Sequence, residues 1–193
     1  RPEGTAGIVR SFVENKLYGN ANIPEKYWYY GPMYRYERPQ AGRFREFYQF
    51  GVEVFGTYDP IMDAEVISIP VNIYRMLGLK GIKVQINSLG DQQSRTNYHN
   101  ALINHFTPHI HTLCTDCQKR FTKNPLRILD CKIDSDKEIM KKAPQMTDYL
   151  NEESRHHFEM VQKYLKELQI PFQINPKIVR GLDYYTHTVF EVE

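Results

Sequence analysis

The sequence contains no apolar run approaching the roughly 18 residues that a membrane-spanning helix needs. It has only three cysteines, an odd number that argues against a secreted disulfide framework and fits a reducing, cytoplasmic location. It also lacks a charge excess, because 25 basic and 23 acidic side chains leave a net charge of +2. This near-balance argues against a polycation that coats nucleic acid. With 41% hydrophobic and 25% charged residues, the chain is predicted to be globular.

The order of periodic segments predicts an α+β fold with a mainly antiparallel sheet flanked by helices. Apolar residues at helical spacing predict helices, and alternating or aromatic-rich runs predict strands. The predicted helices cover 5–18, 63–77, 92–106, 135–142 and 152–168, and the predicted strands cover 27–37, 47–55, 82–86, 172–175 and 183–192. Residues 92–143 are more polar than their surroundings. We therefore predict a sheet-based domain at 1–91, a mainly helical insertion at 92–170, and a return to the first domain at 171–193.

The strands predicted at 27–37 and 47–55 form a hairpin with two different faces, because strand side chains alternate. One face carries Arg35, Glu37, Gln49 and Glu53 near two glycines that leave space above the sheet. The other face is aromatic and is predicted to be core; it carries Trp28, Tyr30, Tyr34, Tyr36, Tyr48, Phe50, Val52 and Val54. The polar face is either simply solvated or the floor of a ligand site, since Arg, Glu and Gln can bind a carboxylate, an ammonium or an amide.

The loop that joins these strands is rich in arginine. Counted from Arg35 to Glu46, it holds four arginines against two glutamates, a local charge of +2. Phosphate binding is one use of such a loop, and an ordinary solvated hairpin tip is the alternative. The segment 180–191 runs from a turn at Gly181 into a strand, and its alternation places Tyr184 and Tyr185 on opposite faces.

Together, the segments 1–7, 31–40, 43–56, 124–130 and 180–191 resemble bacterial histidyl-tRNA synthetases, a family of class II aminoacyl-tRNA synthetases. The hairpin resembles class II motif 2, and 180–191 resembles the signature strand that is specific for histidine. The resemblance covers the whole chain, and it makes 1–91 and 171–193 parts of the catalytic core. It implies ATP with Mg²⁺, L-histidine and tRNA(His) as ligands, a homodimer in the full-length protein, and no membrane partner.

The resemblance also implies a role for individual residues. Arg35 and Arg180 are the implied catalytic residues, both acting at the α-phosphate of ATP. The implied ATP contacts are Arg35, Glu37 and Arg43, and the implied tRNA contacts are Gln40 and Arg45. The implied histidine site consists of Glu3, Gly4, Thr5, Gln49, Glu53, Arg180, Tyr184 and Tyr185. In that site Glu3, Thr5 and Gln49 bind the α-amino group, and Glu53 and Tyr185 bind the imidazole.

The sequence departs from the full family pattern in three places. Class II motif 1, class II motif 3 and an anticodon-binding domain are not found in it. The chain is therefore expected to be an internal section of the catalytic domain that does not aminoacylate alone. A catalytically silent relative, such as the regulatory subunit of ATP phosphoribosyltransferase, is the alternative. Retention of the ATP arginines and of the histidine signature argues against it.

The predicted insertion contains all three cysteines. Cys114 and Cys117 form a CxxC pair, Cys131 follows 14 positions later, and His109 or His111 is the candidate fourth ligand of a tetrahedral zinc site. One CxxC pair favours free cysteines over structural zinc, so no metal is predicted. The basic residues Lys119, Arg120, Lys123 and Arg127 either approach tRNA or form a solvated face. On the helix from 152, His156 and His157 are expected to face solvent in part.

Overall fold

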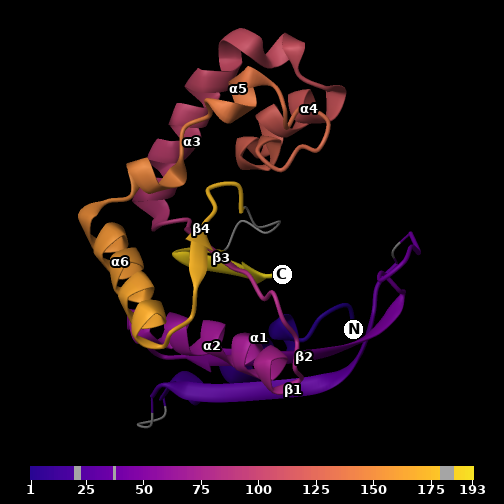
Figure 1. Ribbon diagram of the computed structural model, residues 1–193, viewed down its shortest axis with the longest axis vertical. Coiled ribbons are helices and arrows are strands. Elements are labelled where there is room, and N and C mark those ends of the chain that lie inside the picture. The colour runs from indigo at the N-terminus through magenta and orange to yellow at the C-terminus, as the bar shows by residue number, and fades with distance from the viewer. Residues whose placement is uncertain (20–22, 37, 179–184) are drawn as a thin grey trace. The chain divides into compact units, whose positions relative to one another are not determined.

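The computed structural model describes residues 1–19, 23–36, 38–178 and 185–193 (Figure 1). The α-helices are α1 (Thr5–Glu14), α2 (Pro60–Met76), α3 (Gln92–Phe106), α4 (Thr115–Lys123), α5 (Glu138–Lys141) and α6 (Glu152–Glu167). The strands are β1 (Glu25–Tyr34), β2 (Glu46–Phe55), β3 (Val84–Ser88), β4 (Phe172–Ile174) and β5 (Thr188–Val192). Short 3-10 helices are η1 (Leu17–Gly19), η2 (Thr107–Thr112), η3 (Pro125–Ile128) and η4 (Met146–Tyr149). This mixture confirms the α+β prediction.

The chain divides into two compact units, a first unit of Arg1–Met62 and a second unit of Asp63–Glu193. The first unit is built on the antiparallel β1–β2 hairpin, whose register pairs Gly31 with Gln49 and Tyr27 with Glu53. Helix α1 packs on the face that these residues share, because the Phe12 ring stacks on Phe55 with centroids 4.5 Å apart and meets Tyr27 edge-on. The hairpin and its polar face were thus predicted from the alternation of the two strands.

The aromatic face of the hairpin is exposed, so the prediction that it is core is wrong for this chain. The exposed side chains are Trp28, Tyr30, Tyr34, Tyr36, Tyr48 and Phe50, with Trp28 at 71% of its maximum. Aromatic rings still pair across the strands on this face, for example Tyr30 with Tyr48 at 5.4 Å between centroids. Alternation separates two faces but does not say which one is covered. In the first unit α1 covers the opposite face, because Phe12 anchors it there.

The second unit contains a three-stranded sheet in the order β4-β3-β5. Strand β3 pairs with β4 in parallel and with β5 in antiparallel orientation. Segments on both sides of 92–170 therefore share one sheet, which suits an insertion, although the division at 91 and 170 stays a prediction. The core of this unit combines α2, β3, α3 and α6, and its fully buried members include Ile67, Val71, Ile86, Tyr98, Leu102, Phe106, Val161 and Leu165.

Helix α6 buries one histidine beside the end of the sheet. His157 is only 7% exposed, so the expectation that it faces solvent is wrong, whereas His156 is exposed as expected. The Nε2 atom of His157 lies 3.8 Å from the Asp63 carboxylate, and its ring centroid lies 5.2 Å from that of His187. Burial, and then the neighbouring His157, lower the pKa of His187. The surroundings of His187 therefore disfavour a positive charge on its imidazole.

No helix in the described ranges is long and apolar enough to cross a membrane.

Candidate active site

The polar face of the hairpin is shaped by a tyrosine ring between two glycines. A Cβ atom on Gly51 of β2 would lie 2.1 Å from Cζ of Tyr29, and one on Gly4 would lie 2.1 Å from Cε2 of the same ring. Only glycine leaves room for the ring at both positions. Gly4 is also the N-cap of α1. Tyr29 therefore fixes the start of α1 against the hairpin, and sequence reasoning missed this contact.

The start of α1 brings Thr5 to Glu53. Thr5 is the first helical residue of α1, and its hydroxyl donates to Oε1 of Glu53 at 2.7 Å. The carboxylate of Glu3 accepts instead from the Ala6 backbone N–H at 3.0 Å. Burial raises the pKa of the Glu53 carboxyl, the hydrogen bond from Thr5 opposes the rise, and the charge of Glu3 adds to it. Glu53 is therefore a poorly hydrated acceptor at the entrance of α1.

Gln49 presents an unsatisfied acceptor on the same face. Its Oε1 atom is buried and has no hydrogen-bond partner among the described residues. Leaving a buried acceptor without a donor costs about 1–3 kcal/mol, so such an atom points to a ligand that donates. Its cross-strand partner Gly31 has open space beside it, because a Cβ there would meet nothing within 4 Å. The face thus combines an orphaned acceptor with room for a ligand.

Arg35 follows β1 and lies beside this face. Its guanidinium carbon is 4.6 Å from the centroid of the Phe47 ring, and Phe47 alternates on the same face as Gln49. Its Nε donates to the carbonyl of Pro2 at 2.9 Å. One edge of the guanidinium is therefore used in positioning, and the Nη groups are the donors that can meet a carboxylate or a phosphate. The anchors Phe47 and Pro2 carry no sequence signal that marks them.

The arginine-rich loop closes through a tight turn at its tip. The N–H of Arg43 donates to the carbonyl of Gln40 at 2.9 Å, and the N–H of Gln40 donates back at 3.3 Å. Gly42 between them has a φ of +73°, which favours glycine. The guanidinium of Arg45 lies 5.0 Å from the Tyr36 ring centroid. The side chains predicted to contact ATP and tRNA, Arg43, Gln40 and Arg45, are exposed on this loop.

The signature segment is described only in part. Glu37, Arg180 and Tyr184 lie outside the described residues. Tyr185, in the second unit, is 37% exposed, and its backbone carbonyl accepts from Arg95 at 3.1 Å. Of the predicted site residues, the structure brings together Thr5 and Glu53 directly, and Gln49 and Arg35 on the same face of the hairpin.

Residues 1–192 match the family model described as histidyl-tRNA synthetase. The chain belongs to the histidyl-tRNA synthetase family. It is 62% identical over 192 residues to the histidine–tRNA ligase of Anoxybacillus flavithermus and 60% identical to that of Bacillus velezensis. Each comparison covers 100% of the chain and 45% of the relative. The chain therefore spans about half the length of these curated relatives of the family.

A solved member of the family has the same fold. The apo crystal structure of S. aureus histidyl-tRNA synthetase superposes with a TM-score of 0.79 at 49% identity, covering 100% of this chain and 44% of that one. A Bacillus halodurans structure titled as an ATP phosphoribosyltransferase regulatory subunit or histidyl-tRNA synthetase reaches a TM-score of 0.60 at 22% identity, over 100% of this chain and 53% of that one. At that identity the second likeness shows the fold alone.

Proposed function

We propose that the full protein is a histidine–tRNA ligase, which activates L-histidine with ATP and transfers it to the 3′ end of tRNA(His). Membership of the histidyl-tRNA synthetase family supports this proposal. The observation that carries it to this chain is the buried Oε1 of Gln49, which has no hydrogen-bond partner in the described part of the chain and lies on the face that also holds Glu53. A ligand with an ammonium and an N–H donor satisfies both groups, and L-histidine has both.

The histidine site follows from this pairing. Gln49 accepts from the α-ammonium, with Glu3 and Thr5 at the start of α1 close to Glu53. The Glu53 carboxylate accepts an imidazole N–H, and Tyr185 and Tyr184 complete the imidazole site in the assembled enzyme. Gly4 allows the backbone to approach. An apolar amino acid of similar size would leave the buried groups of Gln49 and Glu53 unpaired, so it is rejected strongly.

The arginines support the chemistry at phosphorus. A carboxylate oxygen of histidine attacks the α-phosphorus of ATP, the bond to the β-phosphate oxygen breaks, and pyrophosphate leaves with the electron pair. Such a reaction needs positioning and charge stabilisation more than a protein base. Arg35 and Arg180 neutralise the developing charge, Arg43 binds the distal phosphates, and Glu37 contacts the adenine side. ATP enters as its Mg²⁺ complex.

The second step requires partners outside this chain. A terminal ribose hydroxyl of tRNA(His) attacks the carbonyl carbon of the adenylate, and AMP leaves. Gln40 and Arg45, which are exposed at the tip of the loop, contact the acceptor end in this proposal. The enzyme acts as a homodimer in the cytoplasm, whose reducing conditions suit the three cysteines of this chain.

The test is pyrophosphate exchange into ATP by the full-length protein, measured with each of the twenty amino acids. We expect exchange with L-histidine alone. A catalytically silent regulatory relative would show no exchange with any amino acid while retaining its fold. Exchange supported by another amino acid would contradict the assignment of Gln49 and Glu53 to histidine.

A further inference from the structure

We propose that Cys114, Cys117, Cys131 and Asp134 form a structural zinc site in the second unit. The sequence favours free thiols because it shows one CxxC pair, but the structure adds a carboxylate as the fourth ligand. His109 and His111, the histidines considered as the fourth ligand, are exposed on η2 and do not belong to the cluster. The proposal does not depend on the ligase activity, because metal content is measured directly.

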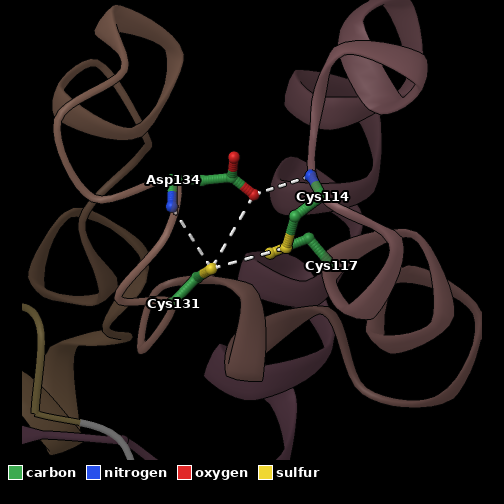
Figure 2. A group of neighbouring side chains, drawn as sticks. All are labelled: Cys114, Cys117, Cys131 and Asp134. Atoms are coloured by element: carbon green, nitrogen blue, oxygen red, sulfur yellow. Dashed lines mark hydrogen bonds between the residues drawn. The ribbon is translucent and has the colours of Figure 1, made fainter.

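The four ligand atoms lie close enough together to surround one tetrahedral ion. All four lie within 4.8 Å of one another (Figure 2). The sulfurs of Cys114 and Cys131 are 3.7 Å apart, and the Cys131 sulfur is 3.7 Å from Oδ2 of Asp134. With Zn–S near 2.3 Å and Zn–O near 2.1 Å, a tetrahedron has edges of about 3.8 Å between sulfurs and about 3.6 Å between sulfur and oxygen. The Cys114–Cys131 and Cys131–Asp134 pairs already have these separations.

Two short segments build the cluster with the same spacing. Cys114 is the N-cap of α4 and Cys117 lies in its first turn, so both sulfurs come from the start of that helix. Cys131 and Asp134 follow η3 and are also three positions apart. The signal missed in the sequence is therefore Cys131-Lys-Ile-Asp134, which repeats the CxxC spacing with a carboxylate in the last place.

Hydrogen bonds from the backbone fix the positions of two of the ligand side chains. The backbone N–H of Cys114 donates to Oδ2 of Asp134 at 2.9 Å, and the backbone N–H of Asp134 donates to the Cys131 sulfur at 3.4 Å. The Nζ of Lys137 lies 2.8 Å from Oδ1 of Asp134. Such contacts orient metal ligands and offset their negative charge.

Burial distinguishes the cluster from ordinary core packing. Cys117 is 0% exposed, Cys131 is 6% exposed and Asp134 is 1% exposed. Small apolar thiols are common in a core, whereas a buried carboxylate is paired or coordinates a metal. Lys137 pairs with Oδ1 of Asp134, and the second oxygen, Oδ2, lies 3.7 Å from the Cys131 sulfur, where it can act as a ligand. Three soft sulfur ligands select zinc over Mg²⁺ or Ca²⁺, and four protein ligands leave no open position for catalysis. The ion would clamp the start of α4 to the turn after η3.

The experiment measures metal in the full-length protein, purified without chelator and with any histidine tag removed. Elemental analysis should give about one zinc per chain. Cys131→Ser and Asp134→Asn should each lose most of it, whereas His109→Ala and His111→Ala, as matched controls, should retain it. Less than roughly a tenth of an equivalent in the unaltered protein would overturn the proposal. Iron or copper in place of zinc, or full zinc in Cys131→Ser, would also overturn it.

Counting reactive thiols distinguishes a zinc site from a disulfide. This measurement uses the unaltered protein, so it does not depend on whether a variant folds. The unaltered full-length protein, denatured without reductant in the presence of chelator, should show one reactive thiol for every cysteine in its sequence, including the three of this chain. A count that falls two short, with Cys114, Cys117 or Cys131 among the unreactive residues in a peptide map, would mean a disulfide, which contradicts a zinc site. In the native protein the thiols should react slowly, and chelator should accelerate their reaction. Thiols that react at the same rate with and without chelator would contradict the proposal.

Discussion

Replacing Gly51 by alanine tests how the hairpin positions the start of α1. The added Cβ would lie 2.1 Å from Cζ of Tyr29, where ordinary contact is 3.4–4 Å, so the ring must move. Gly4 already lies against the same ring, so movement toward α1 displaces the helix start. Overpacking of this kind costs about 1–3 kcal/mol. We expect the free energy of unfolding to fall by that amount and the KM for histidine to rise, because Thr5 shifts relative to Glu53.

The measurement is urea unfolding of the full-length protein, followed through the fluorescence of Trp28, which neighbours Tyr29 on β1. Gly31→Ala is the matched control in the same hairpin, because its Cβ would meet nothing within 4 Å. It should change the free energy of unfolding by less than about 0.5 kcal/mol. Combining Tyr29→Ala with Gly51→Ala should remove most of the cost of the glycine substitution. Equal costs for the two glycine substitutions would refute the steric argument.

Three further predictions concern charge. Glu53→Gln should raise the KM for histidine roughly ten- to a hundredfold, because it weakens a charge-assisted hydrogen bond, and should leave the KM for ATP nearly unchanged. Glu46→Gln, on the opposite face of β2, is the control in the same exchange assays. A larger change in the KM for ATP than in that for histidine would contradict the role of Glu53. Arg180→Ala should reduce pyrophosphate exchange by about a hundredfold or more with an unchanged circular dichroism spectrum; near-normal exchange would contradict it. Because the pKa of His187 is lowered in the folded state, this shift contributes to the free energy of unfolding. The contribution is complete above the unfolded pKa of about 6.5 and is lost as the pH falls through the folded pKa. Urea unfolding at pH 7.5 and 5.5 should show this loss, and His187→Asn, which tolerates the φ of +53°, should reduce it; an equal loss in the variant would assign the titration elsewhere.

Periodicity predicted where the helices and strands lie better than it predicted which of their faces are buried. The helix predicted at 92–106 has those bounds in α3, and the ends of the predicted hairpin strands differ from those of β1 and β2 by at most three residues. The alternation also placed Gln49 and Glu53 on one face. It could not tell that this face is the one packed by Phe12, because burial depends on a helix from elsewhere in the sequence.

Contacts between residues far apart in the chain could not be predicted from the sequence, for a similar reason. The carbonyl of Pro2 that accepts from Arg35, and the ring of Tyr29 between two glycines, depend on how α1 returns to the hairpin. Asp134 was missed because metal-site patterns are read from cysteine and histidine, and an aspartate three residues after a cysteine is common. Only its burial beside three sulfurs makes it a candidate ligand.

The central place of β3 has a consequence for synthesis on the ribosome. Both neighbours of β3 come much later in the chain, β4 beginning at Phe172 and β5 at Thr188. At about 5–20 residues per second, the last partner emerges roughly 5–20 s after β3. During that interval α3 and α6 can cover the side chains of Val84 and Ile86, which belong to the same core, but both edges of the strand remain without partners. A nascent chain that stalls before β5 therefore exposes a strand edge, the feature by which unfinished proteins associate with one another.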